Sequence, residues 1–337
     1  MGAERTAPRY PDRKSGASGS AIQERLTWAD ATRCDPTRPE GLPVPERRVG
    51  SHPVLLEGAV DMHVHFGPEA SIELLSGSTH SVDPIEAARD AAELGMAALV
   101  LKPHEFASTT AAYLASKVVD TITVLAGMCC DYPMGGLNPI AVETALNSGA
   151  RVIWLPTVSS RHGGDEILRL LYGQASGIEV IDEEGEVVEP VRQIMDLVSE
   201  HSAVLATGHI STSEHFAVAN AFAQRGRLVV THAMQEGAGP RLSKSDCVEL
   251  ADLGAVIELT ASTCMGTPAS LAQVADAVRM VGPGRVVMST DYGWSTAIPK
   301  PAAGLQSYVD ALWAEGVSEA DLRQMACVNP ARILQLS

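Results

Sequence analysis

The stretch Gly58-Ala-Val-Asp-Met-His-Val-His-Phe-Gly67 decides how the rest of this 337-residue chain is interpreted. Apolar residues alternate there with Asp61, His63 and His65, as in a buried β-strand. Residues two apart in a strand project from the same face, so both imidazoles are predicted to point the same way. Two imidazoles that converge at a strand end form half of a zinc-type site. Among ten histidines, a chance His-x-His pair is common enough that this pair alone favours a hydrogen-bonded structural role.

From residue 54 the chain alternates short apolar runs with helical segments of about 10–15 residues, the pattern of βα units around a parallel sheet. Strands are expected at residues 58–65, 96–102, 121–128, 151–155, 203–207, 227–231, 255–260 and 285–290. Eight strands with eight helices in about 280 residues predict an α/β fold, a distorted TIM (β/α)8 barrel. A doubly wound open sheet is the alternative, but no Gly-x-Gly-x-x-Gly motif follows the first strand.

Two segments fall outside the repeating βα pattern. Residues 1–53 are rich in Arg, Pro, Ser and Gly and predict an extended or flexible N-terminal arm, with the barrel domain at 54–337. An insertion of about residues 157–189 follows the fourth strand and contains a predicted hairpin that turns at Glu184-Gly185. The role of the arm stays open.

The composition narrows the class of partner. A net charge of −16 disfavours nucleic acid and anionic membrane surfaces, and no apolar run is long enough to span a bilayer. Six cysteines without Cys-x-x-Cys spacing indicate reduced thiols, and the N-terminus lacks the apolar core of a signal peptide. We therefore expect a cytoplasmic protein that acts on a small-molecule substrate.

Chemically active side chains cluster where the predicted strands end. The carboxyl ends of barrel strands supply catalytic residues, so these side chains should meet at one mouth of the barrel. The set consists of His63, His65, Lys102, His104, His209, His232 and Asp291. Lys102 is notable because the chain has only five lysines. The other histidines lie in loops or helices, where surface or hydrogen-bonded roles are commoner.

The pattern Asp61-x-His63-x-His65, with single histidines after strands five and six and an aspartate after strand eight, resembles the amidohydrolase superfamily. The tail Asn329-Pro-Ala-Arg-Ile-Leu-Gln-Leu336 is similar to the helix that closes many of its barrels. The resemblance covers residues 57–337. Because no residues after Leu336 remain for an accessory β-sandwich, the chain resembles the compact branch, near phosphotriesterase-like and decarboxylase-like members.

The resemblance implies a metal centre. His63, His65 and Asp291 would hold one divalent cation, and His209 with His232 a second. Zinc is the first expectation, with manganese, iron and nickel as alternatives. Asp291 would also act as the base, and the predicted catalytic residues are Asp291, Lys102 and His232.

Strand four departs from the family pattern. Binuclear members carry a carbamylated lysine there, whereas this chain has Trp154-Leu-Pro156. Lys102 is the candidate replacement, and the equal alternative is that its ammonium binds a substrate anion. The number of cations per chain, one or two, is therefore left open. His104 is expected to be a ligand or a substrate hydrogen-bonder, and the other predicted substrate contacts are Glu105, Arg161, His162, Tyr292 and Trp294.

These features predict a metal-dependent hydrolase of an amide, cyclic amide, lactone or ester bond in a small molecule. A non-oxidative decarboxylase is the first alternative, favoured by a centre with one cation and no carbamylated Lys102. A metal-bound barrel without catalysis is the second. The resemblance also suggests a homo-oligomer.

Overall fold

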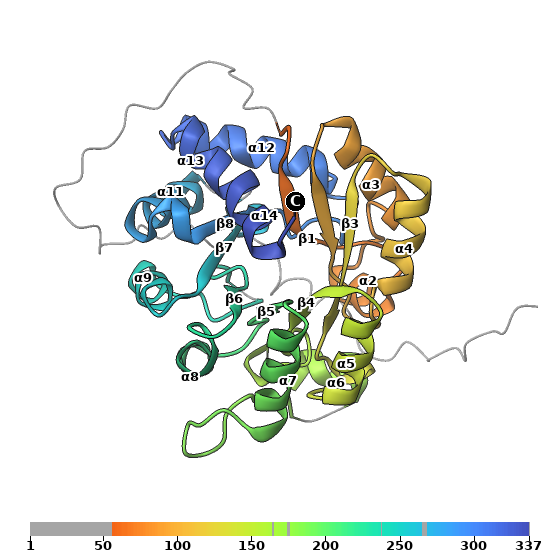
Figure 1. The fold of residues 1–337 in the computed structure, drawn as a ribbon, viewed down its shortest axis with the longest axis vertical. Helices are drawn as coiled ribbons and strands as arrows, with labels where there is room; N and C mark the ends of the chain where they lie inside the picture. The colour runs from red at the N-terminus through yellow and green to blue at the C-terminus, as the bar shows by residue number, and fades with distance from the viewer. Residues whose placement is uncertain (1–55, 164, 174–175, 237, 265–267, 337) are drawn as a thin grey trace, which may run out of the picture. The chain divides into compact units, whose positions relative to one another are not determined.

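Eight parallel strands form one sheet in which every strand pairs with its neighbours in chain order (Figure 1). The computed structural model describes residues 56–163, 165–173, 176–236, 238–264 and 268–336, so the predicted N-terminal arm lies outside the described residues. The strands are β1 (Val60–Val64), β2 (Ala98–Leu101), β3 (Thr123–Cys129), β4 (Ala150–Trp154), β5 (Val204–Ala206), β6 (Arg227–Val230), β7 (Val256–Thr260) and β8 (Val286–Ser289). Each lies within one or two residues of its predicted position.

The sheet closes on itself between its first and last strands. A parallel bridge joins Val64 to Tyr292, just beyond the end of β8. The carboxylate of Asp61 adds a side-chain closure, since its Oδ1 accepts from the backbone N of Thr290 at 3.1 Å. The register between β1 and β2 shifts between residues 61 and 64, which bends β1 at the approach to its histidines. The predicted TIM barrel is confirmed, and the open sheet is excluded.

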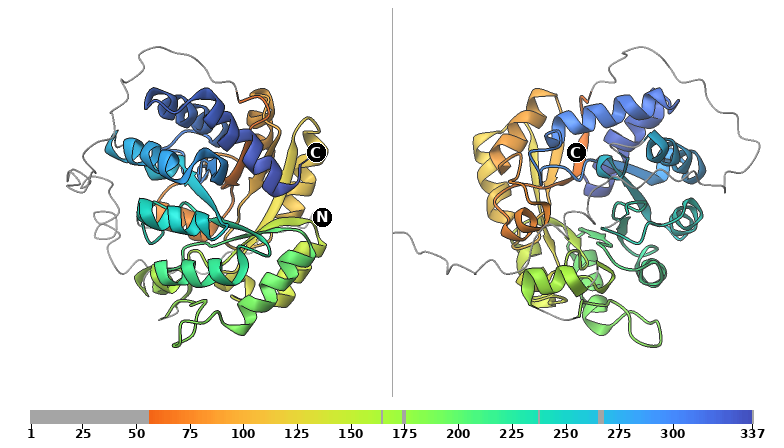
Figure 2. Two further views of the ribbon diagram at one scale, coloured as in Figure 1. Left: turned by 60° about the vertical axis from the view of Figure 1, so that its left-hand side comes forward. Right: turned by 180° about the vertical axis from the view of Figure 1, so that it is seen from behind.

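Helices surround the barrel, as Figure 2 shows from two further sides. They are α2 (Ala70–Ser76), α3 (Pro84–Glu93), α4 (Thr109–Val118), α5 (Pro139–Asn147), α6 (Asp165–Tyr172), α7 (Glu189–Glu200), α8 (Thr212–Phe222), α9 (Lys244–Asp252), α10 (Ala261–Cys264), α11 (Pro268–Val281), α12 (Pro301–Ala314), α13 (Glu319–Arg323) and α14 (Asn329–Leu334). Capping boxes at Asp83, Ser211 and Ser243 fix the starts of α3, α8 and α9. None of the described helices is long and apolar enough to cross a membrane.

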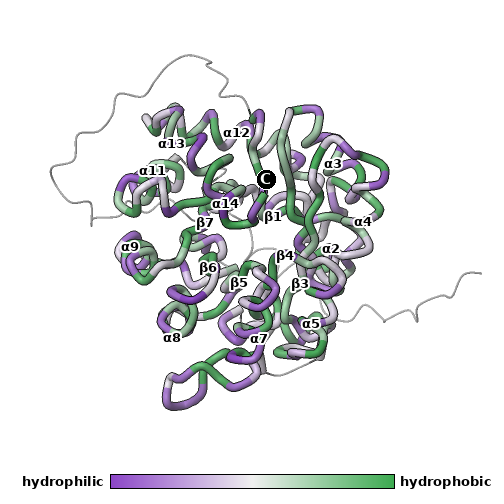
Figure 3. The backbone as a smooth tube through the Cα atoms, in the orientation of Figure 1, coloured by the Kyte–Doolittle hydropathy of each residue, from purple (hydrophilic) through white to green (hydrophobic). Residues whose placement is uncertain are grey.

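Two apolar layers hold the barrel together. One fills the barrel interior and includes Val60, Val152 and Val287, and the other lies between the strands and the surrounding helices. The strands are accordingly buried on both faces, as parallel sheets usually are. Figure 3 shows the helices with mixed hydrophilic and hydrophobic stretches, consistent with one face packed and one face in water.

The C-terminal helix α14 closes the end of the barrel opposite the histidines. Ile333 and Leu334 belong to the interior apolar layer, together with residues near the starts of the strands. The Asn329 side-chain amide donates to the carbonyls of Pro283 and Val286 at 2.7 and 2.6 Å, which ties the helix to the start of β8. Because α14 closes this end, the end of the barrel that carries the histidines is the one available for an active site.

The segment between β4 and α7 contains a 3-10 turn, η2 (Arg161–Gly163), and the helix α6. Ile181 and Val187 then form an antiparallel bridge, and Asp182 N donates to Glu186 O at 2.9 Å. Gly185 has a φ of 82°, a left-handed conformation that glycine adopts without strain. A tight turn therefore lies at the predicted position, whereas α6 was not foreseen.

Candidate metal centre

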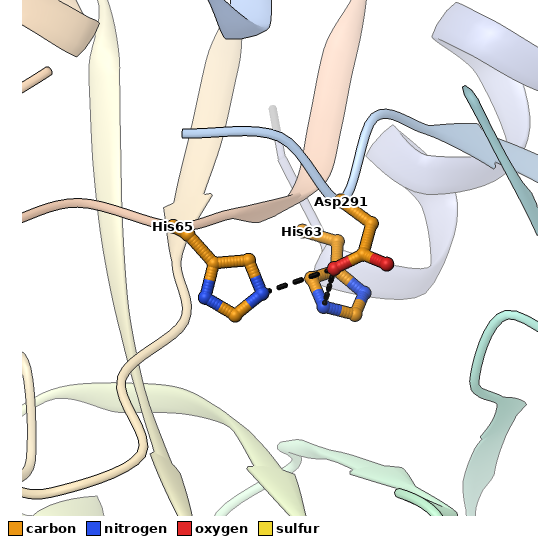
Figure 4. A group of neighbouring side chains, drawn as sticks. All are labelled: His63, His65 and Asp291. Carbon is orange, nitrogen blue, oxygen red and sulfur yellow. Dashed lines mark hydrogen bonds and ion pairs between the residues drawn. The ribbon is translucent and has the colours of Figure 1, made fainter. Parts of the chain in front are cut away.

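Three side chains meet at the barrel mouth, His63 and His65 from β1 and Asp291 from the residue pair after β8. Figure 4 shows both rings turned toward one carboxylate oxygen. The Nε2 atoms of His63 and His65 each lie 3.0 Å from Asp291 Oδ1. All three residues are buried, and one potential ligand atom from each lies within 4.8 Å of the others. The two imidazoles thus project the same way, as the His-x-His spacing predicts.

The backbone around Asp291 is arranged to present its carboxylate. Its φ of 57° is left-handed, a conformation that costs a non-glycine residue about 1 kcal/mol or more. Three hydrogen bonds hold it there: Asp291 N donates to His63 O at 3.0 Å, Trp294 Nε1 donates to Asp291 O at 2.8 Å, and Ser262 Oγ donates to Oδ2 at 2.6 Å. Ser262 thereby fixes the carboxylate rotation and leaves Oδ1 facing the imidazoles.

Glu258 on β7 orients the centre and was missed from the sequence. Its carboxylate is buried and lies 3.1 Å from His63 Nδ1, and it accepts from the backbone N of His232 at 3.0 Å. A carboxylate on Nδ1 holds the proton there and frees Nε2 for a cation. The signal was present, because a glutamate inside an otherwise apolar strand must have a partner.

The donor atoms fit a divalent cation. His65 Nδ1 and His232 Nδ1 are buried and make no hydrogen bond among the described residues, and the nearest partner of His63 Nε2 is the Asp291 carboxylate, 3.0 Å away. Buried polar atoms without partners are uncommon in folded proteins, and a bound ion is one explanation for them. Imidazole nitrogens and a carboxylate oxygen are the ligand types of zinc and related metals.

Protonation of the histidines differs with their surroundings. Burial lowers the pKa of His63, but the charges of Asp291 and Glu258 outweigh it and raise that pKa to about 9. Burial, helped by the Lys102 charge, lowers the pKa of His65 to about 3, and burial lowers the pKa of His232 to about 4. Neutral imidazole is the metal-binding form, so His63 alone must lose a proton to a cation at neutral pH.

His209 and His232 follow β5 and β6 and face each other across 4.7 Å between ring centroids. The His232 ring lies 5.8 Å from that of His63. Gly208, with a φ of 67°, lets His209 enter, because a Cβ there would lie 2.3 Å from the Leu155 carbonyl oxygen. Within the described residues the pair belongs to no compact three-ligand group, so a second cation stays a prediction.

Lys102 and His104, on the β2 side of the mouth, form a separate polar chain. Lys102 is 1% exposed, and its Nζ lies 3.1 Å from His104 Nε2. His104 Nδ1 lies 2.7 Å from Thr157 Oγ1. Thr157 Oγ donates to Asp131, a buried carboxylate after β3 that also accepts from Thr157 N at 2.8 Å. Carbamylation of Lys102 stays a prediction.

Asp131 and Glu69 are buried carboxylates that the sequence analysis missed. Glu69 accepts from the backbone N of His104 and of Glu105, and its Oε2 has no partner among the described residues. Burial raises the pKa of Glu69 to about 8. His65, Glu69 and His104 form a second compact group of potential ligands. The position of Asp131, three residues after a predicted strand, was the signal that could have found it.

The predicted substrate residues lie in several places. The side chains of Arg161 and His162 are exposed, and Arg161 pairs with Glu179 at 2.7 Å. Glu105 accepts from Ala70 N and Ser71 N at 3.1 and 2.8 Å, so its carboxylate caps α2.

The two aromatic candidates after β8 have structural contacts. Tyr292 is 1% exposed and belongs to the apolar layer outside the barrel, and it packs close to Gly304. Trp294 Nε1 donates to the backbone carbonyl of Asp291. Substrate contact by any of these five residues stays a prediction.

Several solved structures share the closed (β/α)8 barrel of this chain. An amidohydrolase from Pseudomonas aeruginosa is 11% identical, with 84% of this chain and 97% of that chain covered and a TM-score of 0.57. A 2,6-dihydroxybenzoate decarboxylase from Rhizobium is 13% identical (83% and 99% covered, TM-score 0.53). A metallo peptidase from Rhodobacter sphaeroides, liganded with a phosphinate mimic of the dipeptide L-Ala-D-Ala, is 15% identical (83% and 99% covered, TM-score 0.53).

Residues 58–258 match a family model, and the chain belongs to that family, described as "Family of unknown function (DUF6282)". None of the curated proteins compared with the chain matches it in sequence. The matched residues run from β1 to Glu258 and so include every candidate ligand except Asp291. At these identities, the solved structures establish the fold alone.

Proposed function

We propose that the chain is a metal-dependent hydrolase that opens an amide, cyclic amide, lactone or ester bond in a small molecule. The observation that carries this proposal is the position of Asp291 Oδ1, 3.0 Å from Nε2 of both His63 and His65. The fold supports it, since solved structures of the same fold include an amidohydrolase and a metallo peptidase.

His63, His65 and Asp291 would hold the cation, zinc first. A divalent cation held there would supply Lewis acidity, which lowers the pKa of water and polarises a carbonyl oxygen. Asp291 takes the proton from the attacking water and returns it to the leaving group. Ser262 keeps the Asp291 carboxylate from rotating, and Glu258 keeps His63 in the metal-binding tautomer.

Non-oxidative decarboxylation is the alternative reaction, and three observations favour it. The three-ligand group describes a centre for one cation, the end of β4 offers Trp154 in place of a bridging ligand, and Lys102 Nζ is engaged by His104. A one-cation centre serves decarboxylation as well as hydrolysis, and a solved decarboxylase shares the fold.

Turnover on metal-loaded protein tests the proposal. N-acetyl amino acids, dipeptides, a hydantoin, lactones and nitrophenyl esters would be offered with zinc or manganese, and aromatic carboxylates would be assayed in parallel for released CO2. We expect hydrolysis of at least one class, lost in Asp291→Asn and kept in the surface control Asp196→Asn, whose side chain is 60% exposed. Release of CO2 without hydrolysis would replace hydrolysis by decarboxylation. Bound metal with neither reaction would refute both.

A further inference from the structure

Lys102 is a buried cation without a counter-ion in the described part of the chain. It is 1% exposed, and no described carboxylate forms an ion pair with it. The more exposed Lys244 and Lys300 each pair with an aspartate, at 3.6 and 3.1 Å. Burying an ammonium without a paired charge is costly, so such a group is retained where something else supplies the charge.

The hydrogen-bond chain behind Lys102 fixes which atom donates at each step. Asp131 accepts two backbone N–H bonds on Oδ1, so its Oδ2 is the acceptor for the single hydroxyl hydrogen of Thr157. Thr157 Oγ1 must then accept from His104 Nδ1, at 2.7 Å. The Lys102 ammonium can only donate, so His104 Nε2 is the acceptor in their contact and the imidazole is neutral. Its hydrogen is therefore on Nδ1, and Nε2 accepts from Lys102 Nζ at 3.1 Å.

One hydrogen of the Lys102 ammonium is thus committed, and two are left. No acceptor among the described residues takes them. Lys102 lies near the metal-binding imidazoles: beyond the larger effect of burial, its charge also lowers the pKa of His65, His209 and His232. The nearest aromatic ring, that of Trp154, lies 5.9 Å from Nζ and supplies only a weak attraction.

We propose that Lys102 Nζ is the anion-binding residue of the site, held in place by His104, Thr157 and Asp131. The substrate therefore carries a carboxylate next to the bond that reacts at His63, His65 and Asp291. A carboxylate matches this position because it accepts both free N–H groups and supplies the missing negative charge. The reaction in this inference rests on the proposed function, whereas the anion subsite does not.

Glu69 is the rival source of negative charge. It lies near Lys102, because the Lys102 charge lowers its pKa, but burial is stronger and the two form no ion pair. If Glu69 were the true counter-ion, Glu69→Gln would strengthen binding of an external carboxylate. If the substrate fills that role, Glu69→Gln leaves the affinity within about twofold of wild type.

Binding of a matched ligand pair tests the subsite. N-acetylglycine and its neutral amide, N-acetylglycinamide, differ only in the carboxylate, and titration of zinc-loaded protein by NMR reports both affinity and any turnover. We expect the acid to bind at least about 10-fold more tightly to wild type, the order expected for one buried charge pair. Lys102→Met should remove that preference and leave the amide affinity unchanged.

A second variant separates positioning from folding. Thr157→Val keeps the ammonium but removes the nearer acceptor for His104 Nδ1 and leaves only the Asp131 carboxylate at 3.4 Å, so the acid should bind about 3-fold to 10-fold less tightly and the amide equally well. Zinc content and melting temperature of each variant confirm the folded state.

Equal binding of acid and amide to wild type would overturn the inference. So would a preference that survives in Lys102→Met, because the cation alone would then hold the carboxylate. Lack of hydrolysis across the substrate panel removes the proposed function and leaves this binding result intact.

Discussion

Two buried polar clusters share the barrel mouth, and they are built in opposite ways. On the β1, β7 and β8 side, Asp291 and Glu258 pair with the two nitrogens of His63, and Nδ1 of His65 and of His232 make no hydrogen bond among the described residues. On the β2, β3 and β4 side, a run of hydrogen bonds from Asp131 ends in the ammonium of Lys102. The first has spare lone pairs and suits a cation, whereas the second has spare hydrogens and suits an anion. A cation site beside an anion site would allow a metal enzyme to bind a negatively charged substrate.

The largest effect is expected at the carboxylate of the first cluster. Asp291→Asn removes both the charge and the base, so kcat/KM should fall at least about 10³-fold on whichever bond is cleaved. The measurement is steady-state turnover with metal content determined on the same sample. Asp196→Asn is the matched control on the surface. Activity within tenfold of wild type in Asp291→Asn would remove Asp291 from the base role.

The next effect is a pH dependence of folding stability caused by Glu69, which accepts a hydrogen bond from the backbone N of His104 in the second cluster. Burial raises the pKa of Glu69 from 4.5 to about 8, so the folded state holds a proton that the unfolded state releases. The resulting stability is fully present below pH 4.5 and is lost as pH rises toward 8, by on the order of 3 kcal/mol. Urea unfolding of metal-free protein at pH 5 and pH 8 measures this.

Glu69→Gln supplies the contrast for that experiment, because an amide does not titrate. Its unfolding free energy should change less than that of wild type between the two pH values. Equal pH dependence in both proteins would assign the titration to another group.

The fold could be predicted because each βα unit has a recognisable pattern in its own stretch of sequence. The run Gly58–His65 shows strand alternation and the end of the strand, and the other seven strands are short apolar runs between helical segments. Of the site, residues at or just beyond the carboxyl ends of strands were found, including His63 near the end of β1 and Asp291 two residues after β8. Glu258 was missed because it lies inside β7, where local pattern gives a strand but not its partners.

The other site residues that were not predicted from the sequence depend on contacts between segments far apart in the chain. Nothing local to Asp131 shows that Thr157 and His104 will complete its hydrogen bonds, since the three are brought together only when β2, β3 and β4 align. The predicted substrate residue Glu105 illustrates the converse. Its position after β2 is right for the mouth, yet its carboxylate is used by the backbone at the start of α2.

A smaller effect is expected when the orientation of the His63 imidazole is weakened and all the proposed metal ligands are kept. Glu258→Gln keeps a polar group beside His63 Nδ1 but removes the charge that raises the His63 pKa. Loss of such an orienting carboxylate weakens metal affinity by about 10-fold to 100-fold. Competition with a chelator measures the dissociation constant. An unchanged constant would show that the cation does not depend on the His63 tautomer.

The smallest effect is the one that separates the two interpretations of Lys102. If the ammonium awaits a substrate anion, Lys102→Met replaces an unpaired buried charge by an apolar chain of similar length. The free energy of unfolding should then rise by about 1 kcal/mol or more, with zinc content unchanged.

A carbamylated Lys102 that bridges two cations predicts the reverse. Lys102→Ala should then bind fewer cations than wild type, and added bicarbonate should raise metal content only in wild type. Elemental analysis beside thermal unfolding decides between the two. Loss of metal together with loss of stability would join the two clusters into one binuclear centre, whereas a gain of stability at constant metal keeps them separate.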